Sequence, residues 1–182
     1  LGATTDDGSP IIIDDTAVVN ALGFYDVLYD STDAFGNPAT QVIRTVNVVD
    51  TTAPIVPVIT DPIDNATTPS PTPTIGGTGE PDSEITVDVD GVSFGPVTVA
   101  FDGTWFIPIT LTEGPNIVTA TSTDGSGNSS DSLPITINLD TTGPVITLIG
   151  DNPQIVELGV GYTELGATTD DGSPIIIDDT AV

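Results

Sequence analysis

The stretch FYDVLYDSTDAFGNPATQVIRTVNVVDTTAP, residues 24–54, alternates apolar and polar side chains in two runs separated by a turn-forming segment. Side chains of a strand point alternately to opposite faces, so every second residue of the first run shares one face. The residues on that face are Tyr25, Val27, Tyr29 and Ser31. The turn TDAFGN at 32–37 leads into a second run, which carries Val46 and Val48 before the linker DTTAP. The stretch is typical of an antiparallel hairpin in a β-sandwich.

The same pattern returns later in the chain, where TDGSGN at 123–128 and DTTGP at 140–144 repeat the turn and the linker. In both places two apolar residues lie 13 and 15 positions after the aspartate of the turn. They are Val46 and Val48 after Asp33, and Ile137 and Leu139 after Asp124. Because a slip of one residue would turn the apolar face outward, this spacing predicts one hairpin register in two modules.

The opening segment LGATTDDGSPIIIDDTAV, residues 1–18, is identical to residues 165–182. The offset of 164 residues indicates one period of a longer repeat plus an overlap. The predicted division is into residues 1–50, the C-terminal part of a module A; residues 51–139, a complete module B; and residues 140–182, the N-terminal half of the next module A.

This division predicts that neighbouring copies complete module A in an end-to-end array. Residues 140–164 of one copy would supply the strands that are missing before Leu1 of the next. The copies could be joined in one continuous polymer or could exchange strands between chains, and the overlap favours the continuous polymer.

The charge of the chain is one-sided, because Arg44 is the single basic residue against 27 Asp and Glu, giving a formal net charge of −26. Nucleic-acid binding needs Lys and Arg side chains that neutralise phosphates, so that class of partner is excluded. No apolar run has the length of a membrane span, and membrane insertion is not expected. The sequence has no Cys and no His. It therefore lacks Cys-ligated zinc and the commonest general base, and we expect no enzyme.

Segments of module B resemble the bacterial immunoglobulin-like (Ig-like) repeats of giant biofilm and surface adhesins, of the Bap and RTX-adhesin kind. The segments are TPTIGGTGEPDSEITVDVDG at 72–91, DGTWFIPITL at 102–111 and TATSTDGSGNSS at 119–130. In module A, residues 144–172 together with 24–54 resemble a second bacterial surface Ig-like family, related to hyalin-type repeats. The resemblance implies an all-β fold of tandem Ig-like antiparallel β-sandwiches joined end to end. Where these repeats usually have Gly after "EP", this chain has Asp82.

On an Ig-like topology, the N-terminal linker and three alternate loops share one end of the sandwich. Five acidic residues, four in module B and one directly before it, would then gather where the preceding module joins. They are Asp50, Glu80, Asp82, Asp102 and Asp124. Hard oxygen ligands without His or Cys suit Ca²⁺, which takes 6–8 oxygens, so this set predicts calcium at the junction. The resemblance implies the same, because many adhesin repeats are stiffened by calcium between domains.

The same reasoning for module A places Asp140 and Asp33 at its own near end, with Asp14 or Asp15 as a further candidate. The DDGS turns at 6–9 and 170–173 are expected at the far end. For each of these aspartates the alternative is turn chemistry alone, because Asp-Gly and Gly-Asn are favoured in turns whatever binds there.

Two further side chains carry specific expectations. Arg44 lies 11 residues after Asp33, and its parity points inward; its stem should pack and its guanidinium should pair with a nearby carboxylate. Trp105 shares one face with Ile107, Ile109 and Leu111 and is expected in the core rather than as a platform for sugars.

The function that these patterns favour is structural: a calcium-rigidified spacer repeat of a long extracellular adhesin or surface fibre. One alternative is a binding module for a glycan or a partner surface, for which Phe106 and the Thr-rich strands are the hints. The other is a fibre subunit that polymerises by completing module A between neighbouring chains.

Overall fold

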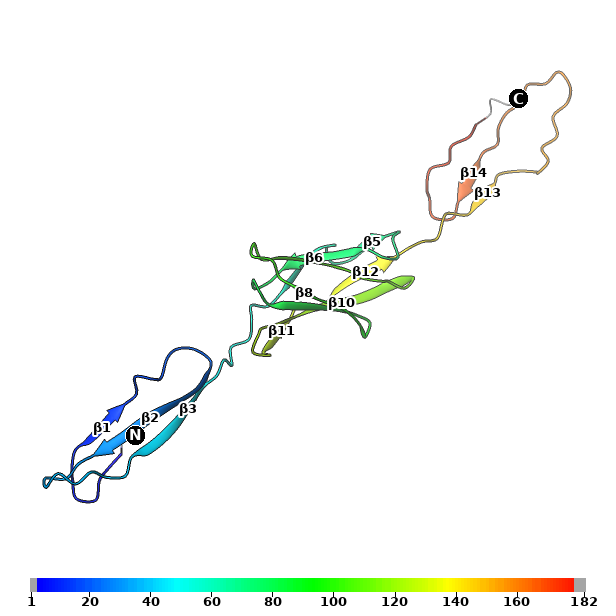
Figure 1. Ribbon diagram of the computed structural model, residues 1–182. Helices are drawn as coiled ribbons and strands as arrows, with labels where there is room; N and C mark the ends of the chain where they lie inside the picture. Colours follow the sequence, from blue (N-terminus) through cyan, green and yellow to red (C-terminus); the bar gives the residue numbers. More distant parts are fainter. Residues whose placement is uncertain (1–2, 179–182) are drawn as a thin grey trace.

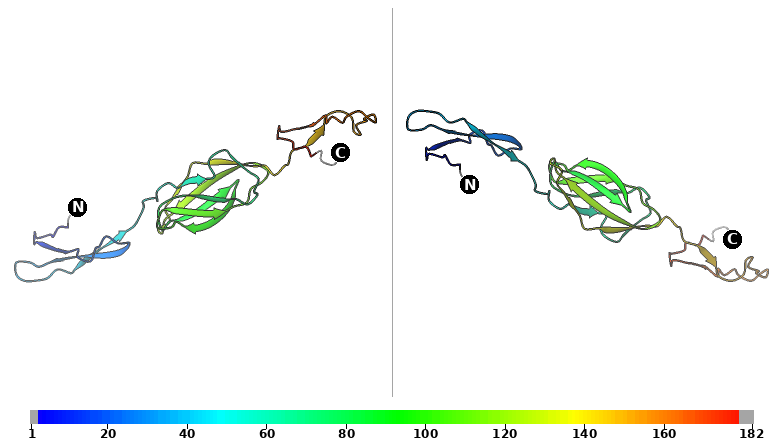
Figure 2. Two further views of the ribbon diagram at one scale, coloured as in Figure 1. Left: turned by 90° about the horizontal axis from the view of Figure 1, so that it is seen from above. Right: turned by 90° about the horizontal axis from the view of Figure 1, so that it is seen from below.

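The computed structural model describes residues 3–178. Their strands form three bodies: a three-stranded sheet, a two-layered sandwich and a short hairpin. Figures 1 and 2 show the three bodies in a row, with linkers at 49–57 and 140–145 between them. In the described part of the chain no helix is long and apolar enough to cross a membrane.

The central body is the sandwich. One sheet has the order β4–β6–β9, made of β4 (Val58–Asp61), β6 (Thr74–Thr78) and β9 (Thr104–Pro108). The other has the order β5–β12–β10–β7–β8, made of β5 (Ala66–Thr68), β12 (Ile135–Leu139), β10 (Gly114–Thr123), β7 (Glu84–Val89) and β8 (Val92–Thr98). Strand β11 (Ser129–Asp131) pairs with β10. Only β5 runs parallel to its neighbour, β12; the other pairs in this body are antiparallel.

Apolar side chains at alternate positions fill the space between the two sheets of the sandwich. The predicted inward face of 104–111 is confirmed, because its four apolar residues are at most 4% exposed. Trp105 lies against β6, where a Cβ on Gly77 would come within 2.1 Å of the Val58 carbonyl oxygen and 2.5 Å of the indole. The glycine is needed because backbone and indole leave no room for a side chain.

The N-terminal body is the sheet β1–β2–β3, made of β1 (Ile11–Asp14), β2 (Gly23–Ser31) and β3 (Val42–Val48). Its strand order matches β7–β10–β12 of the sandwich, and the pairings match residue for residue. The matched pairs include Tyr25–Val46 with Asn116–Ile137, and Val27–Arg44 with Val118–Ile135. The shared register that the spacing predicted is confirmed.

Strands β2 and β10 also begin with the same corner. The Tyr25 hydroxyl donates to the carbonyl oxygen of Ala21 (3.0 Å), and the Asn116 amide donates to that of Thr112 (2.8 Å). In each case the partner lies four residues upstream. A tyrosine that bonds back to the backbone at the start of this strand is a hallmark of Ig-like sandwiches. Asn116 makes the same contact in module B.

The C-terminal body is an antiparallel pair of β13 (Ile146–Leu148) and β14 (Ala167–Thr169), in which Leu148 faces Ala167. Its apolar residues Ile146 and Leu148 are 61% and 56% exposed. The all-β, predominantly antiparallel fold predicted from the sequence is confirmed, with the central body as its complete sandwich.

Candidate functional site

The linker before module B is bound by two loops of that module. The backbone N–H of Ile55 donates to Glu80 Oε2 (2.9 Å). Upstream, the Asp50 carbonyl oxygen accepts from Asn128 Nδ2 (3.4 Å), and Asp50 Oδ2 accepts from Ser126 Oγ (3.5 Å). Asp50 and the Asp124 turn therefore lie together at this junction, and Glu80 lies beside the same linker further along.

The aspartate of each TDxxGN turn is occupied by its own turn. Asp124 Oδ1 accepts the N–H groups of Ser126 (2.8 Å) and Asn128 (2.9 Å), and Oδ2 accepts from Asn128 Nδ2 (2.8 Å). Asp33 accepts the equivalent three bonds from Phe35 and Asn37. The side-chain amide of Asn128, followed by the loop N–H groups, lowers the pKa of Asp124, and Asn37 does the same for Asp33.

The other acidic loops of module B lie at the same end. A bond from Gly79 N to the Gly103 carbonyl oxygen (3.0 Å) joins the loop of Glu80 and Asp82 to the turn that holds Asp102. Asp102 Oδ1 accepts from the hydroxyl (2.7 Å) and N–H (3.0 Å) of Thr104, which lowers the Asp102 pKa. Asp82 adopts φ 67°, in the left-handed region that favours glycine.

These carboxylates are spread along the linker and do not converge on a single metal position. Among residues 3–178, no three His, Cys, Asp or Glu side chains are grouped as the ligands of a metal ion would be. The donor type fits Ca²⁺, because the acidic, hydroxyl and carbonyl groups at the junction offer oxygen atoms. Hydrogen bonds from Ser126 and Asn128 join the Asp124 turn to Asp50, so these two acidic groups are in contact through the turn.

The linker before the C-terminal body repeats the design. Asp140 Oδ1 accepts from Thr142 N and Oγ1 (3.1 and 2.7 Å), as Asp50 Oδ1 accepts from Thr52 N (2.9 Å). The N–H of Val145 donates to Asp170 Oδ1 (2.9 Å), and the N–H of Asp170 donates back to the Val145 carbonyl oxygen (3.2 Å). Each linker thus has a capping aspartate and a carboxylate that binds the residue after the proline.

The expected place of the DDGS turn was wrong. The bonds between Asp170 and Val145 put that turn beside the linker, at the near end of module A. In the N-terminal body, a shallow hollow is lined by Asp7 of the DDGS turn and Asp33 of the TDAFGN turn, so the two turns share one end there too. In the C-terminal body the turn follows β14, and in the N-terminal body it precedes β1. Asp33 lies in the N-terminal body of this chain, and Asp140 lies in the linker before the C-terminal body.

Two residues bind linkers although the sequence analysis did not predict this contact for them. Glu113 accepts from Thr141 N (3.1 Å) and Thr141 Oγ1 (2.7 Å), so module B also holds the linker that follows it. Asp170 is the second. Its signal was present in the sequence, because Asp170 follows Val145 by 25 residues, as Glu80 follows Ile55 by 25.

The remaining candidates of module A are turn residues. Asp14 Oδ1 accepts from Thr16 Oγ1 (2.6 Å) and Thr16 N (3.1 Å), which lowers the Asp14 pKa. The Asp15 carbonyl oxygen accepts from Val18 N (3.0 Å). Asp14 is the last residue of β1, and Asp15 follows it.

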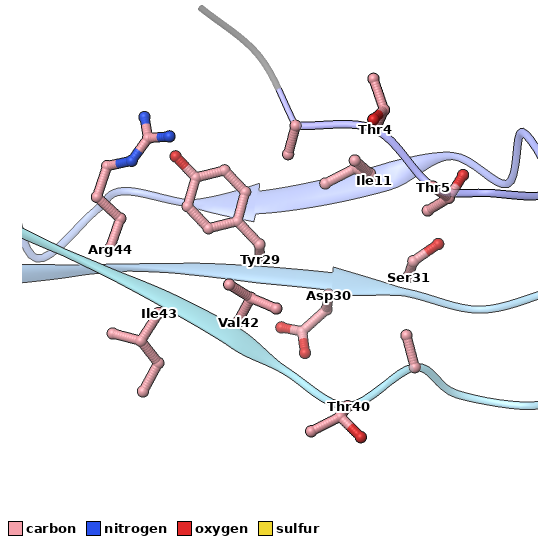
Figure 3. A pocket seen from close by; sticks show the side chains of 12 residues that line it. Thr4, Thr5, Ile11, Tyr29, Asp30, Ser31, Thr40, Val42, Ile43 and Arg44 are labelled. Carbon is pink, nitrogen blue, oxygen red and sulfur yellow. The ribbon is translucent and has the colours of Figure 1, made fainter.

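A cavity of about 560 Å³ lies along the inner face of the β1–β2–β3 sheet (Figure 3). Tyr29, Val42 and Arg44 line it from the sheet, and Thr4 and Thr5 border it from the N-terminal segment. Arg44 is on this face as its parity predicted, but the expected carboxylate partner was wrong for the described residues. Its guanidinium lies over the Tyr29 ring at 5.4 Å from the centroid, a cation–π contact.

Comparisons with known proteins give a family match to part of the chain and several similar solved structures. The family described as "Glucodextranase, domain B" matches residues 57–141, the central body. No curated protein gives a significant match. The chain is similar to a solved structure described as "Biofilm associated protein - BSP domain", with 25% identity and a TM-score of 0.39, over 68% of this chain and 20% of that chain.

Two further solved structures are similar. Fibronectin(III)-like modules of Clostridium thermocellum CbhA have 18% identity and a TM-score of 0.39, over 64% of this chain and 61% of that one. A structure of a 1.5-MDa bacterial ice-binding adhesin has 20% identity and a TM-score of 0.37, over 64% and 42%. The chain thus spans less than two thirds of each of these proteins. The similar solved structures include domains of bacterial surface proteins. We base the function on the geometry of this chain alone.

Proposed function

We propose that this chain is a spacer segment of a long, repetitive, extracellular surface protein. The observation that carries the proposal is the repeated linker geometry: in both linkers a carboxylate 25 residues downstream binds the N–H that follows the proline. A flexible tether between independent domains needs no such bonds. A spacer that must stay extended needs them, because each linker has to keep the two bodies that it joins in a fixed relative direction.

The capping aspartates support the same role. Asp50 and Asp140 each bind the N–H two residues downstream, which fixes the first turn of both linkers. Module B adds Glu113 on the side of the outgoing linker. An exposed loop with several backbone bonds samples fewer conformations than a Gly/Ser-rich linker, so successive bodies stay aligned.

Calcium is the finer part of the proposal, with Asp50, Asp124 and Glu80 as the candidate ligands around the incoming linker. A net charge of −26 on this chain opposes close alignment of successive bodies, and a divalent cation at each joint would screen that repulsion. In this proposal the cation holds the linker against the Asp124 turn, where Ser126 already contacts Asp50.

A calcium titration tests the cation. The chain has one tryptophan, Trp105, in the core of module B, so its fluorescence reports the melting of that body. At a hundredfold excess over the dissociation constant, Ca²⁺ should raise the melting temperature by roughly 10 °C or more relative to EGTA. Asp50→Asn should reduce the shift, whereas Asp61→Asn in β4 should leave it unchanged. An identical melting temperature in Ca²⁺ and EGTA would remove calcium from the proposal.

Small-angle X-ray scattering tests the spacer role without reference to calcium. An aligned array should give an elongated particle, with an axial repeat of roughly 70–80 Å for two modules of ten-residue strands. A compact particle would contradict the spacer role.

The exposed aromatic side chain Phe106 does not favour a separate binding function. Phe106 is 63% exposed, but its ring covers Gly76, where a Cβ would lie 2.8 Å from the ring carbons. The ring thus has a structural partner in β6, and we propose neither a glycan platform nor a catalytic role.

A further inference from the structure

The repeated segment forms different strands in its two copies. In the first copy, Ile11–Asp14 is strand β1, paired with β2, whereas Ala3–Thr5 forms no strand. In the second copy, Ala167–Thr169 is strand β14, paired with β13, whereas 175–178 form no strand. The same sequence becomes a strand only where the chain supplies a partner strand, and each copy has the partner that the other lacks.

Between these two strands, the segment keeps one local structure in both copies. Thr5 Oγ1 donates to the Ser9 carbonyl oxygen (2.8 Å), and Thr169 Oγ1 donates to that of Ser173 (2.9 Å). The turn that follows is capped identically, by Asp7 on Ser9 N and by Asp171 on Ser173 N, at 2.9 Å each. The strand that pairs with one copy can therefore be placed beside the other copy without a change in the local structure of the segment.

The inner face of the β1–β2–β3 sheet is open where module B is closed. Ile13, paired with Tyr29, is 52% exposed, whereas Val87, at the matching position of the sandwich, is fully buried. The cavity in Figure 3 runs between this face and the N-terminal segment. In module B the corresponding space is filled by the sheet β4–β6–β9.

We infer that this open face is the docking surface for residues 146–164 of a second copy of the repeat, which precedes it in one polypeptide. The inference rests on the proposal that the chain is a segment of a repeat array. Transferring the β13–β14 pairing onto the first copy puts Leu148 opposite Ala3, Thr147 opposite Thr4 and Ile146 opposite Thr5.

The transferred strand completes the core of module A. Directly opposite residues of an antiparallel pair share a face, so Ile146 and Leu148 lie on the side of Ala3 and Thr5. In the second copy the two equivalent residues, Ala167 and Thr169, are half-buried, whereas Thr168 between them is exposed. Two side chains that are more than half exposed in this chain then cover the inner face of β1–β2–β3. Asp6 takes the place of Asp170 and binds Val145 of the preceding copy, so the linker contact is kept.

The test is a joined chain, residues 1–164 followed by residues 1–182, compared with the 182-residue chain. Scanning calorimetry should show one additional cooperative transition in the joined chain. In hydrogen exchange, amides of Val42–Val48 should slow by roughly 100-fold or more in one of the two copies. If the joined chain shows only the unfolding transitions of its two module B bodies, the inference is overturned.

Two variants in the first copy of the joined chain test the face that docks. Leu148→Asp should abolish the additional transition, whereas Thr147→Asp, on the opposite face of the same strand, should keep it. Neither change should move the Trp105 fluorescence transition of module B. Equal tolerance of both variants would overturn the assigned register.

Scattering from the joined chain separates this inference from the proposed function. If the joined chain shows the additional transition but scatters as a compact particle, the docking inference is supported and the spacer role is contradicted. If the joined chain scatters as an elongated particle but lacks the additional transition, the spacer role is supported and the docking inference is contradicted.

Discussion

The sheets β7–β10–β12 and β1–β2–β3 have the same strand order and register, yet only the first has a closed core. At matched positions, Val87 is fully buried and Ile13 is 52% exposed. Their turns are also alike: Asp124 and Asp33 accept the same three hydrogen bonds. Strand pairing and turn geometry are therefore determined within about forty residues of sequence, whereas burial depends on a second sheet from elsewhere in the chain.

The first prediction concerns a substitution that disrupts the closed core of module B. Gly77→Ala should destabilise module B by about 3 kcal/mol, because the added Cβ meets the Val58 carbonyl oxygen at 2.1 Å and the indole at 2.5 Å. Urea denaturation followed by Trp105 fluorescence measures the effect. Gly125→Ala, where a Cβ has open space, is the control and should change the free energy of unfolding by less than about 0.5 kcal/mol. Similar losses in both variants would contradict the packing.

The second prediction compares the two corners. Asn116 is fully buried and donates to the Thr112 and Gly114 carbonyl oxygens while its own oxygen accepts from Thr112 N. Asn116→Ala leaves these groups unpaired and should cost about 2–3 kcal/mol in urea denaturation. Tyr25→Phe removes a bond from an exposed corner and should cost less than about 1 kcal/mol, measured by hydrogen exchange in β2. A larger loss at Tyr25 than at Asn116 would reverse the comparison.

The comparison also shows which features could be predicted from sequence. The alternation around Trp105 and Tyr25 predicted the buried faces, because strand periodicity is a local property. The matched spacing after Asp33 and Asp124 predicted the register for the same reason. These parts of the fold needed no knowledge of distant contacts.

The junction was less predictable, because its contacts join residues far apart in sequence. The DDGS turn of 170–173 was placed at the wrong end, since its position depends on the pairing of β14 with β13 across a loop of eighteen residues. Arg44 was expected to bind a carboxylate, but among the described residues the β1–β2–β3 sheet has no second layer, and the Arg44 guanidinium lies over the Tyr29 ring. Whether the junction carboxylates hold calcium stays a prediction.

The third prediction concerns the linker contact. Glu80→Ala should loosen the incoming linker, because the N–H of Ile55 loses its acceptor, while the exposed position limits the loss of stability to about 0.5–1 kcal/mol. Backbone NMR relaxation at residues 51–56 should show increased motion. Glu84→Ala, an exposed glutamate at the start of β7, is the control. Unchanged relaxation in Glu80→Ala would show that the contact does not hold the linker.

The fourth prediction compares the turns of Asp33 and Asp124. It tests whether the Asp33 turn, in the body without a closed core, forms its hydrogen bonds as fully as the Asp124 turn does. The pKa of both Asp33 and Asp124 is lowered, in each case first by the side-chain amide of the following Asn. A folded-state pKa below the unfolded value gives stability that is fully present above the unfolded pKa and is lost as the pH falls through the folded pKa. Carboxyl chemical shifts should therefore titrate below the ordinary aspartate range in both turns. Asn37→Ala should return Asp33 toward that range while Asp124 stays unchanged; an ordinary pKa at Asp33 in the unaltered chain would mean that its turn needs the missing layer.

The smallest expected effect lies at Asp82, which stands where the repeats that module B resembles usually have glycine. Its φ of 67° is a conformation that glycine adopts freely and that Asp tolerates better than Ala, because a short polar side chain can bond locally. Asp82→Gly should leave the free energy of unfolding within about 0.5 kcal/mol of the original, since relief of the backbone is offset by the greater freedom of glycine in the unfolded chain. Asp82→Ala should lower it by about 1 kcal/mol, because alanine has the Cβ and lacks the polar group. Both values are measured by urea denaturation with Trp105 fluorescence. If Asp82→Gly were clearly destabilising, the carboxylate would have a role beyond the turn, and a loss that appeared only in the presence of Ca²⁺ would identify that role as cation binding.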